Sequence, residues 1–229
     1  MPEILKVTLN LIILGTPLVL GLLAVRNLIL VFRRDEDRGR RALLVKRAGL
    51  GIMGAFGFVV AAFAIGEPLA DPGGWLGVGM VASWLVPLAG IGFLIRFKPS
   101  VAQVMLIVLT AAAVSLAVWG IFDENLRDLE DRNGPFTLIP LLVVAIAAAG
   151  LGYYRPTPAA MMLMACALVP PAASVFSPVE AGPGTELYAI VGLPMLVTAV
   201  LYLVSDRISG GVLGSRISRS THLGRPMSA

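Results

Sequence analysis

Polar side chains that could do chemistry are scarce in the long apolar runs of this chain. Four stand out, because each lies inside or beside such a run: Arg26, Asn27, Ser83 and Trp84. An arginine in this setting marks a functional site, or it reaches the polar surface with its long side chain. Asn27 and Ser83 could hydrogen-bond a solute or a neighbouring helix, and Trp84 could pack between helices or contact a ligand. These four are the candidate functional residues.

Other chemistries lack the residues that they need. The only histidine is His222, so paired-histidine haem ligation and a His-Glu-x-x-His metal site are excluded by count. No Asp or Glu lies within a long apolar run, which removes the carboxylates of proton relays and of intramembrane aspartyl proteolysis. The single cysteine, Cys166, is interpreted as a small apolar core residue. The sequence therefore predicts no enzyme, no cofactor and no metal site.

The composition is that of a membrane protein. Of the 229 residues, 57% are hydrophobic and 14% are charged, and the mean hydropathy is +0.87. A helix of roughly 20 residues crosses a hydrocarbon core of about 30 Å. The sequence predicts an all-α, multi-pass bundle of seven transmembrane helices in the cell membrane, at Leu9–Leu30, Ala48–Ile65, Trp75–Ile95, Val101–Phe122, Phe136–Tyr154, Pro158–Phe176 and Leu187–Val204.

Basic residues are unevenly divided between the connecting segments. The segments after the first, third, fifth and seventh apolar runs contain fourteen Lys and Arg residues. The amino terminus and the segments after the second, fourth and sixth runs contain three. Because cytoplasmic loops are rich in Lys and Arg, the amino terminus is predicted outside and the carboxyl terminus in the cytoplasm. Tyr154 and Tyr202 fall near the predicted inner ends, where aromatic rings prefer the headgroups. Residues 1–205 are predicted to form the transmembrane domain, and residues 206–229 a basic, disordered cytoplasmic tail.

A short motif occurs twice. Arg96–Leu106 (RFKPSVAQVML) and Tyr153–Leu163 (YYRPTPAAMML) share Pro, Ala, Met and Leu at an offset of 57 residues. Ser100 begins a capping-box spacing in the first copy, and Thr157 is predicted as the N-cap in the second. Both copies begin helices that run outward. The match predicts repeated helical hairpins, three–four and five–six, with chance matching of common residues as the alternative.

The charge of Arg26 predicts where the first span ends. In an unbroken helix, Arg26 would lie roughly 10 Å before Arg33, at 1.5 Å per residue. An arginine at the centre of a bilayer costs at least about 2.5 kcal/mol. We therefore predict that the span ends near Val25 and that residues 26–32 run along the inner interface. A guanidinium held by backbone carbonyls or by a partner's acid is the alternative.

Two functions fit these features. One is a non-enzymatic accessory, assembly or scaffold component of a membrane protein complex. It is favoured by the lack of catalytic residues, by small residues at helix-packing spacing and by the basic cytoplasmic side. The alternative is a facilitative transporter or channel for a small, largely uncharged solute, which the repeated, proline-containing hairpins favour. Seven helices and an outside amino terminus resemble the sugar-facilitating SWEET carriers in topology, although the Pro-Gln signature of related repeats is missing.

The expected partners follow from the same charges. The basic side should face the anionic inner leaflet of the bilayer. A membrane protein, or a second copy of the chain, is the expected protein partner. Nucleic acid is not expected, because the cytoplasmic arginines that set the topology account for the pI of 9.6.

Overall fold

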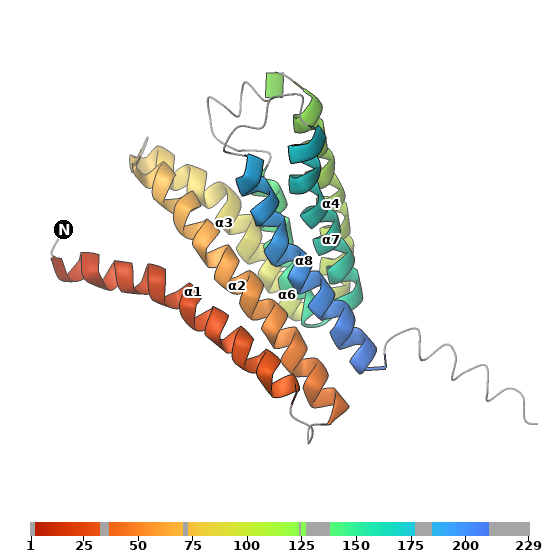
Figure 1. Ribbon diagram of the computed structural model, residues 1–229. Coiled ribbons are helices and arrows are strands. Elements are labelled where there is room, and N and C mark those ends of the chain that lie inside the picture. Colours follow the sequence, from red (N-terminus) through yellow and green to blue (C-terminus); the bar gives the residue numbers. More distant parts are fainter. Residues whose placement is uncertain are drawn as a thin grey trace, which may run out of the picture.

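The computed structural model of the chain describes residues 3–32, 37–70, 73–123, 125–126, 138–176 and 185–210. The described part is all-helical (Figure 1). Its seven helices are α1 (Glu3–Val31), α2 (Arg38–Ala70), α3 (Gly74–Phe97), α4 (Pro99–Phe122), α6 (Leu138–Gly152), α7 (Pro156–Phe176) and α8 (Thr185–Ile208). Each predicted span falls on one of these helices. Most of the predicted tail, residues 211–229, lies outside the described residues.

Four of these helices are long and apolar enough to cross a membrane. The stretches concerned, searched over the described residues, are Arg38–Ala62 in α2, Gly74–Phe97 in α3, Pro99–Phe122 in α4 and Val191–Ile208 in α8. Three further apolar stretches are shorter, namely Gly15–Val31 in α1, Ile139–Gly152 in α6 and Pro156–Val169 in α7. The prediction of a helical membrane bundle is confirmed at this level, by length and composition.

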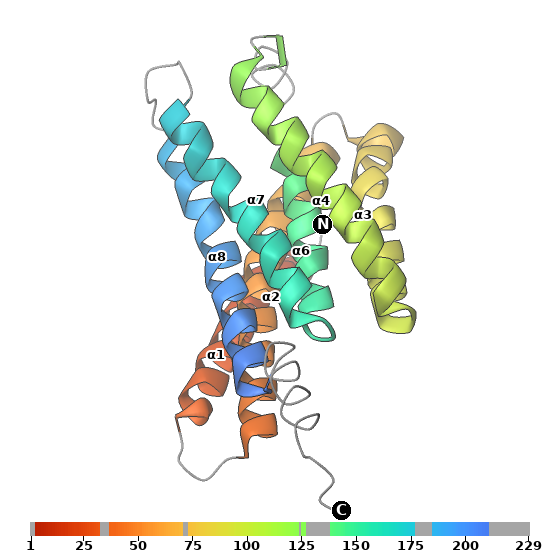
Figure 2. The ribbon, with the colours of Figure 1, turned by 90° about the vertical axis from the view of Figure 1, so that its right-hand side faces the viewer.

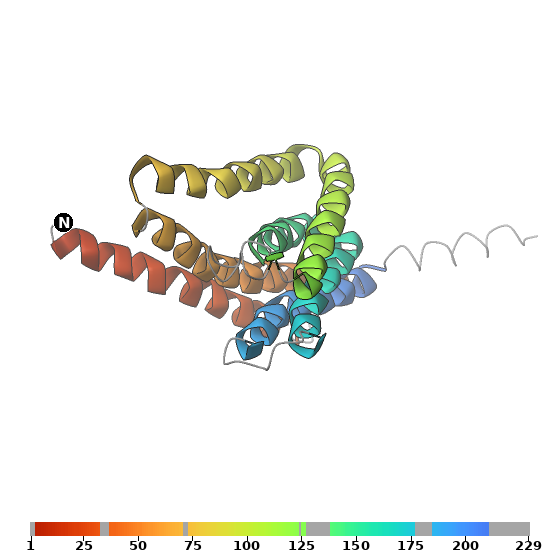
Figure 3. The same cartoon turned by 90° about the horizontal axis from the view of Figure 1, so that it is seen from above.

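α6 is the central helix of the bundle. It packs against α2, α3, α4, α7 and α8, which lie around it in the view from above (Figure 3). Leu141, Ala145, Ala148 and Leu151 are wholly buried, and α6 contains only apolar side chains, glycine and a proline. A helix that is apolar all round belongs in an interior. α1 lies at the edge and packs on α2.

The close contact between α7 and α8 depends on a glycine. Pro171 has no N–H to donate to the carbonyl of Ala167, four residues earlier in α7. A Cβ added to Gly192 of α8 would lie 2.7 Å from that carbonyl oxygen. Glycine therefore lets the α8 backbone approach a carbonyl that lacks its usual hydrogen bond within α7. The Cα–H groups of a closely packed backbone are weak donors to such an oxygen.

Tyr202 joins α8 to α2 and α6 in an arrangement that we call the tyrosine clasp, formed with Gly49, Ala149 and Gly152. The side chain of Tyr202 is wholly buried. A Cβ on Gly49 would lie 3.1 Å from its Cε1 atom, and a Cβ on Gly152 would overlap the ring. The phenol donates a hydrogen bond of 2.6 Å to the carbonyl oxygen of Ala149, in the last turn of α6. Such carbonyls lack an intrahelical donor, so the bond satisfies a helix end.

The predicted helix caps of the repeat are wrong. α4 begins at Pro99 after the N-cap residue Lys98, which makes no side-chain capping bond, and α7 begins at Pro156. Proline suits the first helical position because its fixed φ matches the helix and its missing N–H is not needed there. Ser100 and Thr157 are therefore one residue inside their helices, and their hydroxyls serve contacts between helices instead.

The predicted ends of the first two spans also differ from the structure. α1 continues without a break to Val31, so no helix end marks the predicted end of the span near Val25, and the position of residues 26–31 at the inner interface stays a prediction. α2 begins at Arg38, ten residues before the predicted Ala48. Hydropathy marks only the apolar part of a helix, whereas Arg, Lys, Leu and Ala extend it because they are good helix formers. Ala42 and Val45 are buried, so this extension is packed and not free.

Gly152→Ala is expected to destabilise the protein, because the new methyl group would occupy the space of the Tyr202 ring. Overpacking of this kind costs about 1–3 kcal/mol. Gly150→Ala is the matched control on the same helix, because a Cβ there would lie 3.7 Å from Cδ1 of Ile95, an ordinary contact. Thermal unfolding in detergent should shift to lower temperature in the first variant only. Equal melting temperatures of the two variants would contradict the clasp.

Candidate functional site

The four candidate residues lie in two places, not one. Arg26 and Asn27 are on α1, whereas Ser83 and Trp84 are on α3, and α2 runs between these two helices (Figures 1 and 3). Arg26 and Ser83 are exposed, and Asn27 and Trp84 are partly buried. The structure therefore does not bring the four side chains together.

Trp84 lines a small cavity among α2, α3 and α6. The cavity measures about 100 Å³, and Gly57, Leu88 and Ile146 are among the residues around it. Apart from the indole, its walls are aliphatic side chains and glycine. Ser83 does not face this space, since its hydroxyl is exposed and donates to the carbonyl oxygen of Met80 at 2.7 Å. The cavity thus offers a solute hardly any hydrogen-bonding groups.

Buried hydroxyls in the described bundle bond to main-chain carbonyls. Thr110 donates to Leu106 at 2.7 Å, and Ser205 donates to Tyr202 at 2.7 Å. Thr198 donates across to the carbonyl of Gly49 at 3.3 Å. Together with Tyr202, these are the side chains with a hydroxyl that are buried within the described residues. Each of these hydroxyls is therefore bonded within the bundle, and the rest of the described core is apolar.

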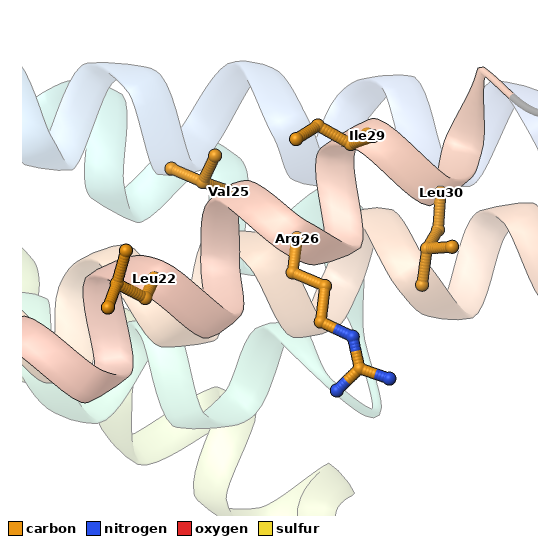
Figure 4. A pocket seen from close by; sticks show the side chains of 5 residues that line it. All are labelled: Leu22, Val25, Arg26, Ile29 and Leu30. Carbon is orange, nitrogen blue, oxygen red and sulfur yellow. The ribbon is translucent and has the colours of Figure 1, made fainter.

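Arg26 lies beside an apolar hollow on the outer face of α1. The hollow has a volume of about 480 Å³ and is lined, besides Arg26, by Leu22, Val25, Ile29 and Leu30 (Figure 4). The Arg26 side chain projects away from the helix axis. Among the described residues, no hydrogen bond or ion pair holds its guanidinium.

Two polar contacts join helix ends at the end of the bundle that holds the α6–α7 turn. Nη2 of Arg155 donates to Oγ of Ser100 at 2.9 Å, which connects this turn to the first turn of α4. The Thr157 hydroxyl donates to Oδ2 of Asp206 at 2.8 Å, which connects the first turn of α7 to the last turn of α8. A carboxylate beside a helix N-terminus is also favoured by the helix dipole. Sequence reasoning missed these contacts.

One sequence signal could have indicated the tyrosine clasp. Thr198, Tyr202 and Ser205 follow one another at spacings of four and three residues, which places them on one face of α8, and Ser209 follows four residues later, just after the helix end. Three of the four are buried. A polar stripe of this kind in an apolar helix indicates a face that contacts other helices.

A second hollow lies between α4 and α7. It measures about 390 Å³, and its polar lining residues are Gln103 and Thr110. The hydroxyl of Thr110 is already bonded to its own helix. The remaining lining is apolar, with Met161 and Met162 contributing flexible side chains.

The described residues contain no group of His, Cys, Asp and Glu side chains that could hold a metal ion. The chain matches no family model, no curated protein and no solved structure. Its function is therefore argued from its own residues.

Asp123 ends α4 in a set of hydrogen bonds. Nε1 of Trp119 donates to one carboxylate oxygen at 2.9 Å, and the main-chain N–H groups of Asn125 and Leu126 donate to the other at 2.9 and 3.2 Å. The N–H of Leu126, followed by the indole and by Asn125, holds the pKa of Asp123 below its usual value, against a smaller opposing effect of desolvation.

Acidification should therefore break the bond between Trp119 and Asp123 only at low pH. Because the folded pKa is depressed, these contacts contribute stability above the ordinary carboxyl pKa of about 3.9 and lose it as the pH falls through the lower, folded pKa. With Trp75→Phe and Trp84→Phe, Trp119 is the sole tryptophan, and its emission should titrate with a midpoint below about 3.9. Asp123→Asn should abolish the step. A midpoint above the ordinary value would overturn this assignment.

Proposed function

We propose that this chain is a seven-span protein of the cell membrane and an accessory, assembly or scaffold component of a membrane protein complex. Its amino terminus lies outside and its carboxyl terminus in the cytoplasm, as the fourteen-to-three division of Lys and Arg favours. The role is non-enzymatic, and the partner is a membrane protein or a second copy of the chain.

One observation carries this proposal: two of the four polar candidates are on the outside of the bundle, whereas the described interior is apolar. Arg26 and Ser83 are exposed, and the buried hydroxyls are bonded to carbonyls. A carrier needs polar groups that converge on a path through its interior. Polar groups on outer helix faces suit contacts with other molecules of the membrane.

α3 is the helix that best fits a partner within this proposal. Only 17% of its span is buried in the bundle, against 33% for the other three long apolar spans. A Cβ added to Gly79 or Gly90 would meet nothing within 4 Å, so these glycines serve no described packing contact of the chain. Pro87 offers no N–H to the carbonyl of Ser83, and both residues are exposed. A donor from a partner helix would satisfy that carbonyl in a medium without water.

A repeated hairpin also belongs to the proposal. Both motif copies begin a helix at their proline, and the second copy contacts the first through Arg155 and Ser100. Duplication of α3–α4 into α6–α7 would account for the two equivalent starts. The two helix pairs should then superpose after rotation about an axis near the membrane normal.

Bulky substitutions on α3 test the partner surface. Gly79→Leu and Gly90→Leu should leave the isolated chain folded, because each new side chain enters open space. They should reduce co-purification of a stoichiometric membrane partner in mild detergent, since overpacking at a close helix contact costs about 1–3 kcal/mol. Ala112→Leu, on the exposed face of α4, is the matched control and should retain the partner.

Three readouts separate the possible results. Unchanged thermal unfolding of the purified variants shows that the loss lies in the complex and not in the fold. A chain that purifies alone and monodisperse, under conditions that preserve other complexes, would contradict the accessory role. Flux of a small uncharged solute through proteoliposomes of the lone chain would favour the alternative, a facilitative transporter or channel.

A further inference from the structure

We propose that the outer face of α1 binds one anionic phospholipid, with the lipid phosphate on Arg26 and an acyl chain along the hollow formed by Leu22, Val25, Ile29 and Leu30. The inference rests on the orientation proposed above, which puts the α6–α7 turn on the cytoplasmic side. It names a site and a ligand class that the accessory role does not require.

The first step is the depth of Arg26. A Cβ on Gly51 of α2 would lie 3.1 Å from the Cβ of Ala24, so these residues face each other across the α1–α2 hairpin. Arg26, two residues after Ala24, is then level with Gly49, two residues before Gly51. Gly49 belongs to the tyrosine clasp, which also contains the last residue of α6. Arg26 therefore lies at the level where α6 ends.

The second step is the extension of the α1–α2 hairpin. The end of α1 and the start of α2 lie farther along the bundle than the α6–α7 turn (Figures 1 and 2). The eleven residues from Arg38 to Ala48 precede Gly49 in α2 and span about 16 Å at 1.5 Å per residue. We place the inner headgroup level at the end of α6, and Arg26 lies at that level although α1 does not break there. The hairpin itself continues past the end of α6.

The third step is the direction of the side chain. Figure 4 shows the Arg26 side chain projecting away from the axis of α1, so the guanidinium lies off the helix surface beside the hollow. A long basic side chain that places its charge toward the interface and its methylene groups along apolar surface is favourably solvated by lipid headgroups.

The fourth step is the complementarity of the surface. Leu22, Val25 and Ile29 are 62%, 54% and 60% exposed, so the hollow is open to an acyl chain along its length. Among the described residues the guanidinium has no acidic partner, so its charge is available to a ligand. A planar guanidinium suits phosphate, because it can donate two parallel hydrogen bonds. An apolar strip that ends in an arginine without a partner among the described residues therefore fits an anionic phospholipid.

Native mass spectrometry of the full chain, delipidated and then titrated with phosphatidylglycerol or phosphatidylcholine, tests the site. The wild-type chain should retain one phosphatidylglycerol in preference to phosphatidylcholine. Arg26→Gln should weaken this retention roughly fivefold, the effect of about 1 kcal/mol for one basic residue at an anionic surface. Arg26→Lys should retain part of it. Arg96→Gln, which removes an exposed arginine from the last turn of α3, is the matched control and should change little.

Each other outcome overturns the assignment. Equal losses in Arg26→Gln and Arg96→Gln would mean diffuse attraction to charge, and displacement of the lipid by inorganic phosphate would mean a free-anion site. Unchanged lipid retention with loss of a protein partner in Arg26→Gln would assign the guanidinium to a partner's carboxylate. The lipid site and the partner surface on α3 can fail separately, because one is read with the lone chain and the other with the complex.

Discussion

Tyr202 can be buried at the junction of α2, α6 and α8 only because two other helices present glycine to its ring. Gly49 and Gly152 leave the space that the ring fills, and the phenol satisfies the carbonyl of Ala149 at the end of α6. A phenol buried away from water needs a hydrogen-bond acceptor, and here the acceptor is the carbonyl oxygen of Ala149. The ring must pack closely against α6 to reach it. The clasp fixes the level of three helices relative to one another.

Much of the remaining arrangement follows from that level. Because Gly49 must meet Tyr202, the part of α2 before Gly49 extends past the end of α6 and carries α1 with it. The same constraint places Arg26, on the peripheral helix α1, at the level where α6 ends. Near the clasp, Arg155 in the α6–α7 turn donates a hydrogen bond to α4, and Asp206 of α8 accepts one from α7. These two bonds connect the helix ends around the clasp. The apolar interior and the exposed polar side chains of Arg26 and Ser83 are the basis of the proposed role among other membrane components.

The sequence predicted the helices better than their contacts. Apolar runs set the seven helices because burial and membrane solvation act on every residue of a span. The start of α2 at Arg38 was missed, since a charged helical extension has no hydropathy signal. Tyr202 was interpreted as a headgroup-facing ring, because its burial depends on Gly49 and Gly152, which lie far away in the chain. Ser100 was predicted as a helix cap because its spacing fits a capping box. The helix instead begins one residue earlier, at Pro99. Short-range patterns predict single helices. The tyrosine clasp and the helix-end contacts made by Arg155 and Asp206 join residues that are far apart in the chain, so such patterns do not predict them.

The most direct test of this account is the free energy of unfolding of Tyr202→Phe in mixed micelles. The variant keeps the ring and removes the hydroxyl, so it isolates the bond to the buried carbonyl of Ala149. The account predicts a loss of about 1–3 kcal/mol, the cost of leaving a buried polar group without its partner. Tyr154→Phe, at a tyrosine that is 41% exposed, should change stability little. A Tyr202→Phe variant as stable as the wild-type chain would contradict the claim that this clasp holds the bundle together.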